Sequence, residues 1–176
     1  MALRDVAITA EPLSSPAAAA LIERLDAELT ERYPNPEDNH FELTDEQVGE
    51  GRGVFLVARV AGRPVGCGAL RRLDGVTGEI KRMYVAPLAR RAGVGRRLLA
   101  ELERHARRLG LHRLVLETGE RQPEAIRLYE RAGFLRIPAF GEYVESPASV
   151  CMGKAIHALP PAAESTHPRS CGTGGG

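Results

Sequence analysis

Apolar and polar positions repeat with two different periods along this chain, and each period predicts one kind of element. In residues 15–33 the apolar side chains recur at helical spacing; they are Ala18, Ile22, Leu25 and Leu29. Ser15 followed by Pro16 is a typical helix start, and Pro34 ends the pattern. We therefore predict a first amphipathic helix here, preceded by a short strand in "DVAITA".

The pattern changes to β-rich runs between residues 54 and 85. These runs are "VFLVARV", "VGCGALRRL" and "VTGEIKRMYV". Two turn signals separate them, Gly62 to Pro64 and Asp74-Gly75. Three strands joined by two tight turns predict an antiparallel meander.

The second half of the chain alternates helical and strand-like segments. A long amphipathic helix ends at Gly110, and its apolar stripe consists of Val94, Leu98, Leu102, Ala106 and Leu109. The strand "LHRLVLET" follows, then a helix from Pro123 to Gly133, then two final strands in "FLRIPAF" and "SVCMGKAI". A strand, a helix and a second strand in succession predict a parallel crossover.

Two segments carry no clear period. Residues 35–53 are polar and mixed, and we expect a loop that borders a pocket, with a short helix around Thr44 to Val48. Residues 158–176 are rich in Pro, Ala, Ser and Gly, and we expect a disordered tail. The predicted organisation is one domain over residues 1–157 followed by that tail.

Composition excludes several classes of protein. Lys and Arg total 24 against 23 for Asp and Glu, so no overall positive field favours nucleic acid or an anionic membrane. The three cysteines stand far apart without metal-ligand spacing, which argues against a disulfide framework and a zinc site. No stretch is apolar enough for a signal core or a membrane span, and we expect a cytoplasmic protein.

The stretch "RRAGVG", Arg90 to Gly95, lies between a predicted strand and the long helix. A helix N-terminus exposes backbone N–H groups, and glycine lets an anion approach them closely. The arginines add donors suited to phosphate. The loop therefore predicts binding of a phosphate or pyrophosphate, although it matches neither the P-loop nor the dinucleotide fingerprint.

Arg90-x-x-Gly93-x-Gly95 resembles the phosphate-binding loop of the GNAT superfamily of acyl-CoA-dependent N-acyltransferases. The strand exit "MYVAP", the long helix, "LHRLVLET" and "QPEAIRLYERAGF" also resemble that family, in its order, over residues 4–157. The resemblance implies an α/β fold with a mixed, mostly antiparallel sheet. It further implies a splayed parallel strand pair at the cofactor site, helices on both faces, and acetyl-CoA as cosubstrate without a metal.

The resemblance also implies which residues hold acetyl-CoA. The backbone near Met83, Tyr84 and Val85 would hold the pantetheine arm and the acetyl carbonyl. Three side chains would also contact the cofactor: Gln122, where the family has Asn, Ala125 and Tyr129. The pyrophosphate would lie on the loop and the first helical turn, formed by Arg90, Arg91, Ala92, Gly93, Val94, Gly95 and Arg96.

Three residues are candidates for proton transfer. Tyr129 matches the family's tyrosine near the cofactor sulfur and would protonate the departing thiolate, or it packs as a core aromatic. Glu79 stands where some family members carry a glutamate base, or it is paired with a neighbouring cation. Glu117 is the rival base, or it organises the loop "TGERQ".

Candidate substrate contacts lie on several segments. Arg82 would hold a substrate carboxylate or pair with an acid, Glu117 borders the same cleft, and Tyr33, Phe140 and Tyr143 would form pocket walls or pack on the sheet. Arg82 favours a carboxylate-bearing amine, whereas the acidic segment 37–50 favours a cationic one. Amino acids, polyamines, aminoglycoside-like drugs and peptide N-termini all stay open as acceptors.

Residues and resemblance together predict an N-acetyltransferase that moves the acetyl group of acetyl-CoA directly to a primary amine of a small molecule. Cys67 and Cys151 are expected to be small buried side chains rather than acetyl carriers. One alternative is a CoA-sensing or partner-binding module without turnover, and another is a nucleic-acid-binding domain that uses the arginine-rich middle. A homodimer is compatible with the prediction.

Overall fold

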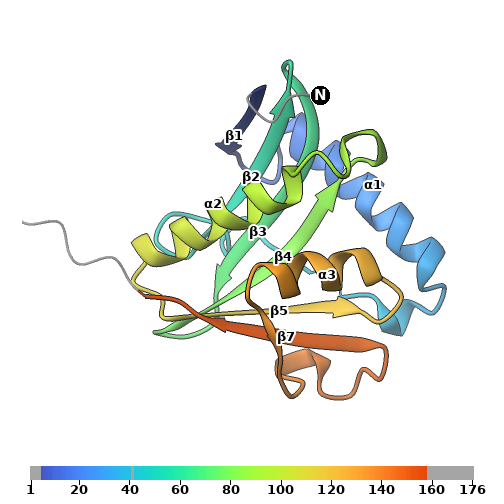
Figure 1. The fold of residues 1–176 in the computed structure, drawn as a ribbon, viewed down its shortest axis with the longest axis vertical. Helices are drawn as coiled ribbons and strands as arrows, with labels where there is room; N and C mark the ends of the chain where they lie inside the picture. The colour runs from blue at the N-terminus through green and yellow to red at the C-terminus, as the bar shows by residue number, and fades with distance from the viewer. Residues whose placement is uncertain (1–4, 41, 158–176) are drawn as a thin grey trace, which may run out of the picture.

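The computed structural model describes residues 5–40 and 42–157, which form one seven-stranded sheet (Figure 1). The strand order is β1-β2-β3-β4-β5-β7-β6. The strands are β1 (Val6–Ala10), β2 (Gly53–Val60), β3 (Arg63–Arg72), β4 (Thr77–Val85), β5 (Arg113–Gly119), β6 (Leu135–Arg136) and β7 (Ser149–Ala155). β4 and β5 pair in parallel, and the other neighbouring strands pair antiparallel, which confirms the mixed, mostly antiparallel sheet.

Helices cover both faces of the sheet (Figure 1). They are α1 (Pro16–Arg32), α2 (Val94–Arg108) and α3 (Pro123–Arg131), with short 3-10 turns η2 (Pro36–Asp38), η3 (Pro87–Ala89) and η4 (Gly141–Tyr143). On one face α1 packs against side chains of β2 and β3 such as Phe55 and Cys67. On the other, α2 and α3 pack against side chains such as Leu56, Leu70 and Leu114. No helix among the described residues is long and apolar enough to cross a membrane.

The first helix begins as predicted, because the Ser15 hydroxyl accepts a hydrogen bond from the Ala18 backbone N–H at 3.1 Å and Pro16 occupies the first turn. Its buried stripe differs from the prediction at several positions, and Leu29 of the predicted stripe is only half-buried. Leu21 is fully buried, whereas Ile22 is only half-buried at the edge of the same core. The stripe that faces a sheet is wide, and spacing alone does not fix its centre.

Two predictions are wrong in detail, one for a turn of the meander and one for the loop before it. The turn between β2 and β3 consists of Ala61 and Gly62, both with positive φ, while Pro64 belongs to β3. The register shifts at Ala58, where Pro64 faces Arg59, so the strand accommodates a residue without an N–H. The expected helix at 44–48 is instead a turn, in which the Gln47 N–H donates to the Thr44 carbonyl at 3.0 Å.

The end of the domain is also less regular than predicted. The strand expected in "FLRIPAF" comprises only Leu135 and Arg136, because Pro138 follows closely and cannot donate to a ladder. The predicted strand "SVCMGKAI" is confirmed as β7, which lies between β5 and β6. The tail expected at 158–176 lies outside the described residues.

The sheet opens at its centre, between β4 and β5. Parallel pairing runs from Thr77 opposite Arg113 to Ile80 opposite Leu116 and then stops. Arg82 has φ 58° and lies where the β3–β4 register shifts, so β4 bulges at that point and stays with β3. β5 continues beside β7 instead. The two strands therefore diverge, as the resemblance implied, and leave a wedge between them.

Candidate functional site

Two pockets open at this wedge. The pocket between the diverging strands, called here the wedge pocket, is lined by Leu25, Leu29, His40, Ile80, Lys81, Arg82, Met83, Glu117, Thr118, Gln122, Tyr129 and Tyr143. A second, called here the loop pocket, is lined by Leu29, Tyr33, Asp38, Asn39, His40, Glu117, Gly119, Gln122 and Ala148. Both contain Leu29, His40, Glu117 and Gln122, so they share one wall. The loop before β2 borders a pocket, as expected from the sequence.

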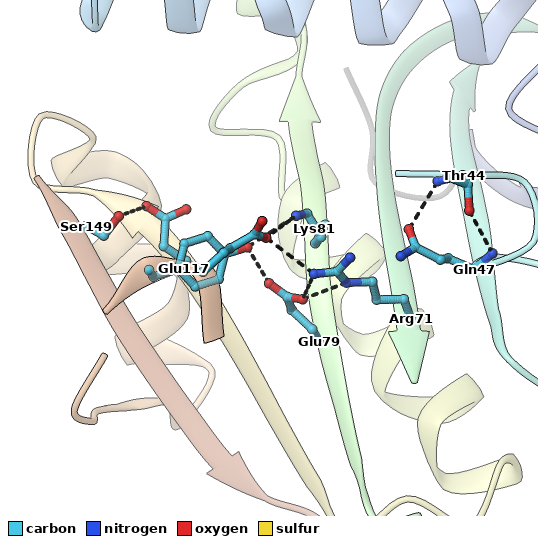
Figure 2. Close-up of polar contacts among 9 residues, drawn as sticks. Thr44, Gln47, Arg71, Glu79, Lys81, Glu117 and Ser149 are labelled. Atoms are coloured by element: carbon cyan, nitrogen blue, oxygen red, sulfur yellow. Dashed lines mark hydrogen bonds and ion pairs between the residues drawn. The ribbon is translucent and has the colours of Figure 1, made fainter. Parts of the chain in front are cut away.

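Glu79 lies on β4 but does not line either pocket. It has no exposed surface, and its Oε2 accepts from the Arg71 Nε and Nη2, each at 2.7 Å. Its Oε1 accepts from the Tyr143 hydroxyl at 2.5 Å (Figure 2). Both carboxylate oxygens are therefore engaged beneath the pocket wall.

The buried network continues to η4 through Lys81. Its Nζ donates to the Tyr143 hydroxyl and to Glu142 Oε1, each at 3.2 Å. Burial raises the pKa of Tyr143, and the Glu79 carboxylate beside it raises that pKa further. Burial also raises the pKa of Glu142, but Lys81 and Arg71 outweigh it, so that pKa lies below its ordinary value. This network fixes Tyr143 as a neutral wall of the wedge pocket.

Glu117 lies on β5 just beyond the end of parallel pairing. Its Oε1 accepts from the Ser149 hydroxyl at 2.7 Å, and Figure 2 shows this pair apart from the network around Glu79. Oε2 has no hydrogen-bond donor among the described residues, and the side chain lines both pockets. Burial raises the pKa of Glu117, an effect only partly offset by the Ser149 hydrogen bond, His40 and Lys81.

His40 is a pocket residue that the sequence reasoning did not select. Its ring meets the Tyr143 ring edge-on, with centroids 5.0 Å apart. Its Nε2 is shielded from solvent and has no hydrogen-bond partner within the described part of the chain. A single histidine in a loop without a periodic pattern cannot be recognised by its spacing. The sequence predicted only that the loop containing His40 borders a pocket.

Tyr129 is both a core residue and a pocket residue. Its ring packs edge-on against Phe134 with centroids 6.0 Å apart and is 5% exposed, and it lines the wedge pocket. Burial, and to a smaller extent the charge of Glu117, raise the pKa of this phenol. Tyr129 therefore keeps its proton at neutral pH.

The loop before α2 has the backbone of an anion site. Gly93 is the N-cap with φ 76°, Arg91 is also left-handed with φ 64°, and no side chain caps the helix. The Arg97 N–H donates to the Gly93 carbonyl at 3.1 Å, and the N–H groups before it lie in the first turn. Arg91 and Arg96 are exposed there, whereas Ala92 is half-buried.

Close packing holds this helix start in place. Val94 and Gly95 are buried, and a Cβ on Gly95 would lie 3.2 Å from the Leu128 side chain on α3. Arg90 points back into the protein, where its Nε donates to the Val85 carbonyl at 2.8 Å and its Nη2 to Glu28 at 2.6 Å. Its guanidinium thus connects the loop to β4 and α1, and its backbone remains beside the start of α2.

The other predicted cofactor residues lie around the wedge. Met83 and Gln122 line the wedge pocket, and Gln122 is the N-cap of α3. Val85 and Ala125 are half-buried and pack against the α2 face core. Tyr84 is buried on the opposite face beside α1, where the Arg90 guanidinium lies 5.9 Å from its ring centre.

The predicted substrate residues separate into two groups. Arg82 and Tyr143 line the wedge pocket and Tyr33 lines the loop pocket. Arg82 is buried and ion-paired with Asp26 of α1, so its charge is already balanced. Phe140 lines neither pocket and packs edge-on against Tyr143 at 5.2 Å.

Neither a metal cluster nor a reactive thiol is found in the described residues. No group of three His, Cys, Asp or Glu side chains within 5–40 and 42–157 is arranged to hold a metal ion. Burial raises the pKa of Cys67 to about 12, and its Sγ contacts the Arg82 carbonyl at 3.3 Å. Cys67 is thus a neutral buried thiol.

Comparisons with known proteins agree with this geometry. Residues 19–134 match the profile of the acetyltransferase (GNAT) family. The IAA acetyltransferase of Azospirillum brasilense is 44% identical over 154 residues, covering 86% of this chain and 99% of the relative. A crystal structure from Klebsiella pneumoniae, assigned as an acyl-CoA N-acyltransferase, is 36% identical with a TM-score of 0.73, covering 85% of this chain and 97% of that one. A GNAT acetyltransferase of Elizabethkingia anophelis, solved with acetyl-CoA bound, shares the fold at 20% identity and a TM-score of 0.63, covering 87% of this chain and 99% of that one.

Proposed function

Since the chain belongs to the GNAT family of acetyltransferases, we propose that it moves the acetyl group of acetyl-CoA directly to a primary amine of a small molecule. The observation that carries this proposal is the wedge between β4 and β5, which opens beyond Ile80. A helix N-terminus suited to an anion lies near the end of β4, and a pocket with a carboxylate and a phenol lies inside the wedge.

The loop from Arg90 to Arg96 fits the pyrophosphate of acetyl-CoA. Gly93 is left-handed, no side chain caps α2, and Arg91 and Arg96 are exposed beside the first turn. Backbone N–H groups and the helix dipole favour an anion at such a place. The end of β4 beyond Ile80, which has no partner on the β5 side, would hold the pantetheine arm near Met83 to Val85.

The reaction requires a neutral amine, a polarised thioester carbonyl and a proton for the leaving sulfur. Acetyl-CoA supplies the thioester. Backbone N–H groups at the splayed end of β4 would stabilise the carbonyl oxygen as the C–N bond forms. The C–S bond then breaks, and Tyr129 would donate its proton to the thiolate. Because the pKa of Tyr129 is raised, this transfer is favourable only if the phenolate regains a proton from the acetylated nitrogen.

The charges near the pockets favour a cationic acceptor. Asp38 and Glu117 line the loop pocket, while Asp26 balances Arg82 and Glu142 balances Lys81. Arg82 is therefore paired with an acid, the second of the two roles expected for it, and attracts a substrate carboxylate less strongly than an unpaired arginine would. We expect an acceptor with an ammonium group and no carboxylate beside it.

The test is acetyl-CoA-dependent thiol release across a panel of compounds. The panel includes spermidine, L-lysine, tyramine and kanamycin, and also IAA, because a 44% identical relative is named for it. We expect turnover with a primary amine, and Tyr129→Phe should lower kcat by about 10²-fold, which is the usual size of a lost proton transfer. Because Phe retains the ring contact with Phe134, acetyl-CoA affinity should not change.

Two outcomes of these measurements would contradict the proposal. A protein that binds acetyl-CoA, as measured by calorimetry, but releases no thiol with any compound of the panel would be a CoA-sensing module. A Tyr129→Phe enzyme with unchanged kcat would remove Tyr129 from the mechanism.

A further inference from the structure

We propose that Glu117, on the wall shared by the two pockets, is the base that takes the proton from the acceptor ammonium, and that His40 relays this proton outward. The inference rests on the proposed function and assigns the base within it. It differs from the prediction that Glu79 fills this role through its position on β4.

The surroundings of Glu79 prevent it from meeting an acceptor. The side chain is 0% exposed, one oxygen holds two N–H donors of Arg71, and the other holds the Tyr143 hydroxyl. Neither oxygen is left to accept a hydrogen bond from an acceptor ammonium in either pocket. The role of Glu79 is to fix Tyr143 and Arg71.

Glu117 has the accessibility that Glu79 lacks. It lies one residue beyond the last parallel pair, Ile80 opposite Leu116, where the strands diverge, and its side chain lines both pockets. Ser149 holds one oxygen at 2.7 Å and orients the carboxylate. The second oxygen is left for an ammonium N–H in the wedge pocket, where Tyr129 also lies.

The groups facing Glu117 come from four elements. β4 contributes the negative Glu79 and the positive Lys81, β7 contributes the Ser149 hydroxyl, and the loop before β2 contributes His40. On α3, Tyr129 lines the same pocket and is affected by the charge of Glu117. The net result of these neighbours and of burial is a carboxylate with increased affinity for a proton, as a base requires.

His40 provides the second observation. Its Nε2 is a buried polar atom with no hydrogen-bond partner in the described residues, a situation that costs free energy unless a ligand or water pairs with it. The ring is held by its edge-on contact with Tyr143 and lines both pockets. An imidazole at this place is suited to pass a proton from Glu117 toward the loop pocket.

The step balances as a proton transfer. The ammonium R–NH₃⁺ gives one proton to the Glu117 carboxylate, which becomes a neutral carboxylic acid, and the neutral amine attacks the thioester carbon. Because no direct hydrogen bond joins Glu117 to His40 in the described part of the chain, Glu117 then passes that proton through a pocket water to His40, which releases it to bulk water. Tyr129 transfers the second proton, from nitrogen to sulfur, so that one proton leaves for each acetyl group moved.

The experiment compares Glu117→Gln with the wild type over pH, using the panel amine that the wild type acetylates fastest. Gln can still accept from Ser149 but cannot take a proton. We expect kcat/KM at pH 7 to fall by about 10²- to 10⁴-fold. The loss should shrink as the pH approaches the pKa of the acceptor amine, because solution then supplies the neutral amine. The matched control is Glu120→Gln, an exposed neighbour that lines neither pocket and should keep wild-type kinetics.

His40 is tested by two variants. His40→Phe keeps a ring against Tyr143. It should lower kcat about tenfold, which is less than the usual rate gain from a positioned acid or base, and should leave KM unchanged. In His40→Ala, added imidazole should restore kcat, which a purely structural loss would not allow.

Three results would overturn the proposal. They are a Glu117→Gln enzyme with wild-type kcat/KM at pH 7, a loss by the same factor at every pH, and no rescue of His40→Ala by imidazole. The first two remove Glu117 as the base, and the third removes His40 as the relay. A wild type without turnover overturns the proposed function itself, so the two failures are distinguishable.

Discussion

Glu79 and Glu117 lie on neighbouring strands, yet their carboxyl groups have different surroundings. Glu79 meets an arginine and a hydroxyl and is buried, whereas Glu117 meets one hydroxyl and borders both pockets. Residue type and strand position alone selected both as candidates. Their partners, which come from β3, β7 and η4, separate the fully engaged glutamate from the one that we propose as the base.

The raised pKa of Glu117 predicts a gain in stability when its charge is removed. A folded-state pKa above the unfolded value contributes stability below the unfolded pKa, and this contribution is lost as pH rises through the folded pKa. The ionised carboxylate therefore destabilises the protein at neutral pH. We expect Glu117→Gln to melt at a higher temperature than the wild type at pH 7 to 8, and to show no such gain below about pH 4.

Thermal unfolding followed by circular dichroism across pH checks this prediction. A lower melting temperature for Glu117→Gln at neutral pH would mean that the carboxylate stabilises the fold. Higher stability combined with lost activity is the pattern expected when a reactive group is kept at a cost to stability.

Glu79 gives the opposite prediction. Glu79→Gln removes the nearer counter-charge of the half-buried Arg71 guanidinium and leaves only its longer ion pair with Glu142, at 3.4 Å. Breaking a buried ion pair typically costs about 3–5 kcal/mol, and the pair that remains makes the expected loss smaller than that. We expect the free energy of unfolding, measured in urea at neutral pH, to fall. The Glu79→Gln protein that remains folded should show the same dependence of kcat/KM on pH as the wild type. A variant as stable as the wild type would contradict the structural role assigned to Glu79.

At the scale of elements, the start of α2 is the feature that the sequence predicted in most detail. The signals for this helix start are local in the sequence. They are the two glycines, the preceding strand and the amphipathic stripe, and the helix begins at Val94 as they indicated. The inward turn of Arg90 toward Val85 and Glu28 was not predicted, because it depends on α1 packing beside β4.

Two glycines that flank α2 allow a matched test of the proposed anion site. Gly93 and Gly110 stand at opposite ends of the helix with φ 76° and 73°. Glutamate at either position meets similar left-handed strain of about 1–2 kcal/mol, but only Gly93→Glu places a negative charge at the N-terminus. We expect Gly93→Glu to weaken acetyl-CoA binding at least tenfold by calorimetry and Gly110→Glu to leave it near the wild-type value. Equal effects of the two variants would contradict an anion site at this helix start.

At the scale of the whole molecule, the site follows from the way in which the sheet opens. β4 stays with β3, β5 stays with β7, and the helices on the two faces hold the halves together around the gap (Figure 1). The order of elements and the parallel crossover were predictable, because long periodic segments with clear turns determine them. In the function that we propose, the acetyl donor and the acceptor would approach one another through the wedge.

The contents of the wedge were only partly predictable. Tyr129 and Glu117 were selected and line the wedge pocket, but His40 was missed and Phe140 lies behind Tyr143. The expected helix at 44–48 and the placement of Pro64 failed for a related reason, because a turn and a register shift depend on the neighbouring strand. Sequence periodicity carries little information about loops, and His40, the pocket residue that was missed, lies in a loop.

The most direct test of the account is the stoichiometry of products from the wild-type protein. Acetyl-CoA and the amine panel are incubated with the protein, and free CoA thiol and acetylated amine are quantified together by mass spectrometry. We expect one N-acetylated primary amine for each CoA thiol released. Thiol release without an acetylated amine, or acetyl-CoA binding without either product, would contradict it.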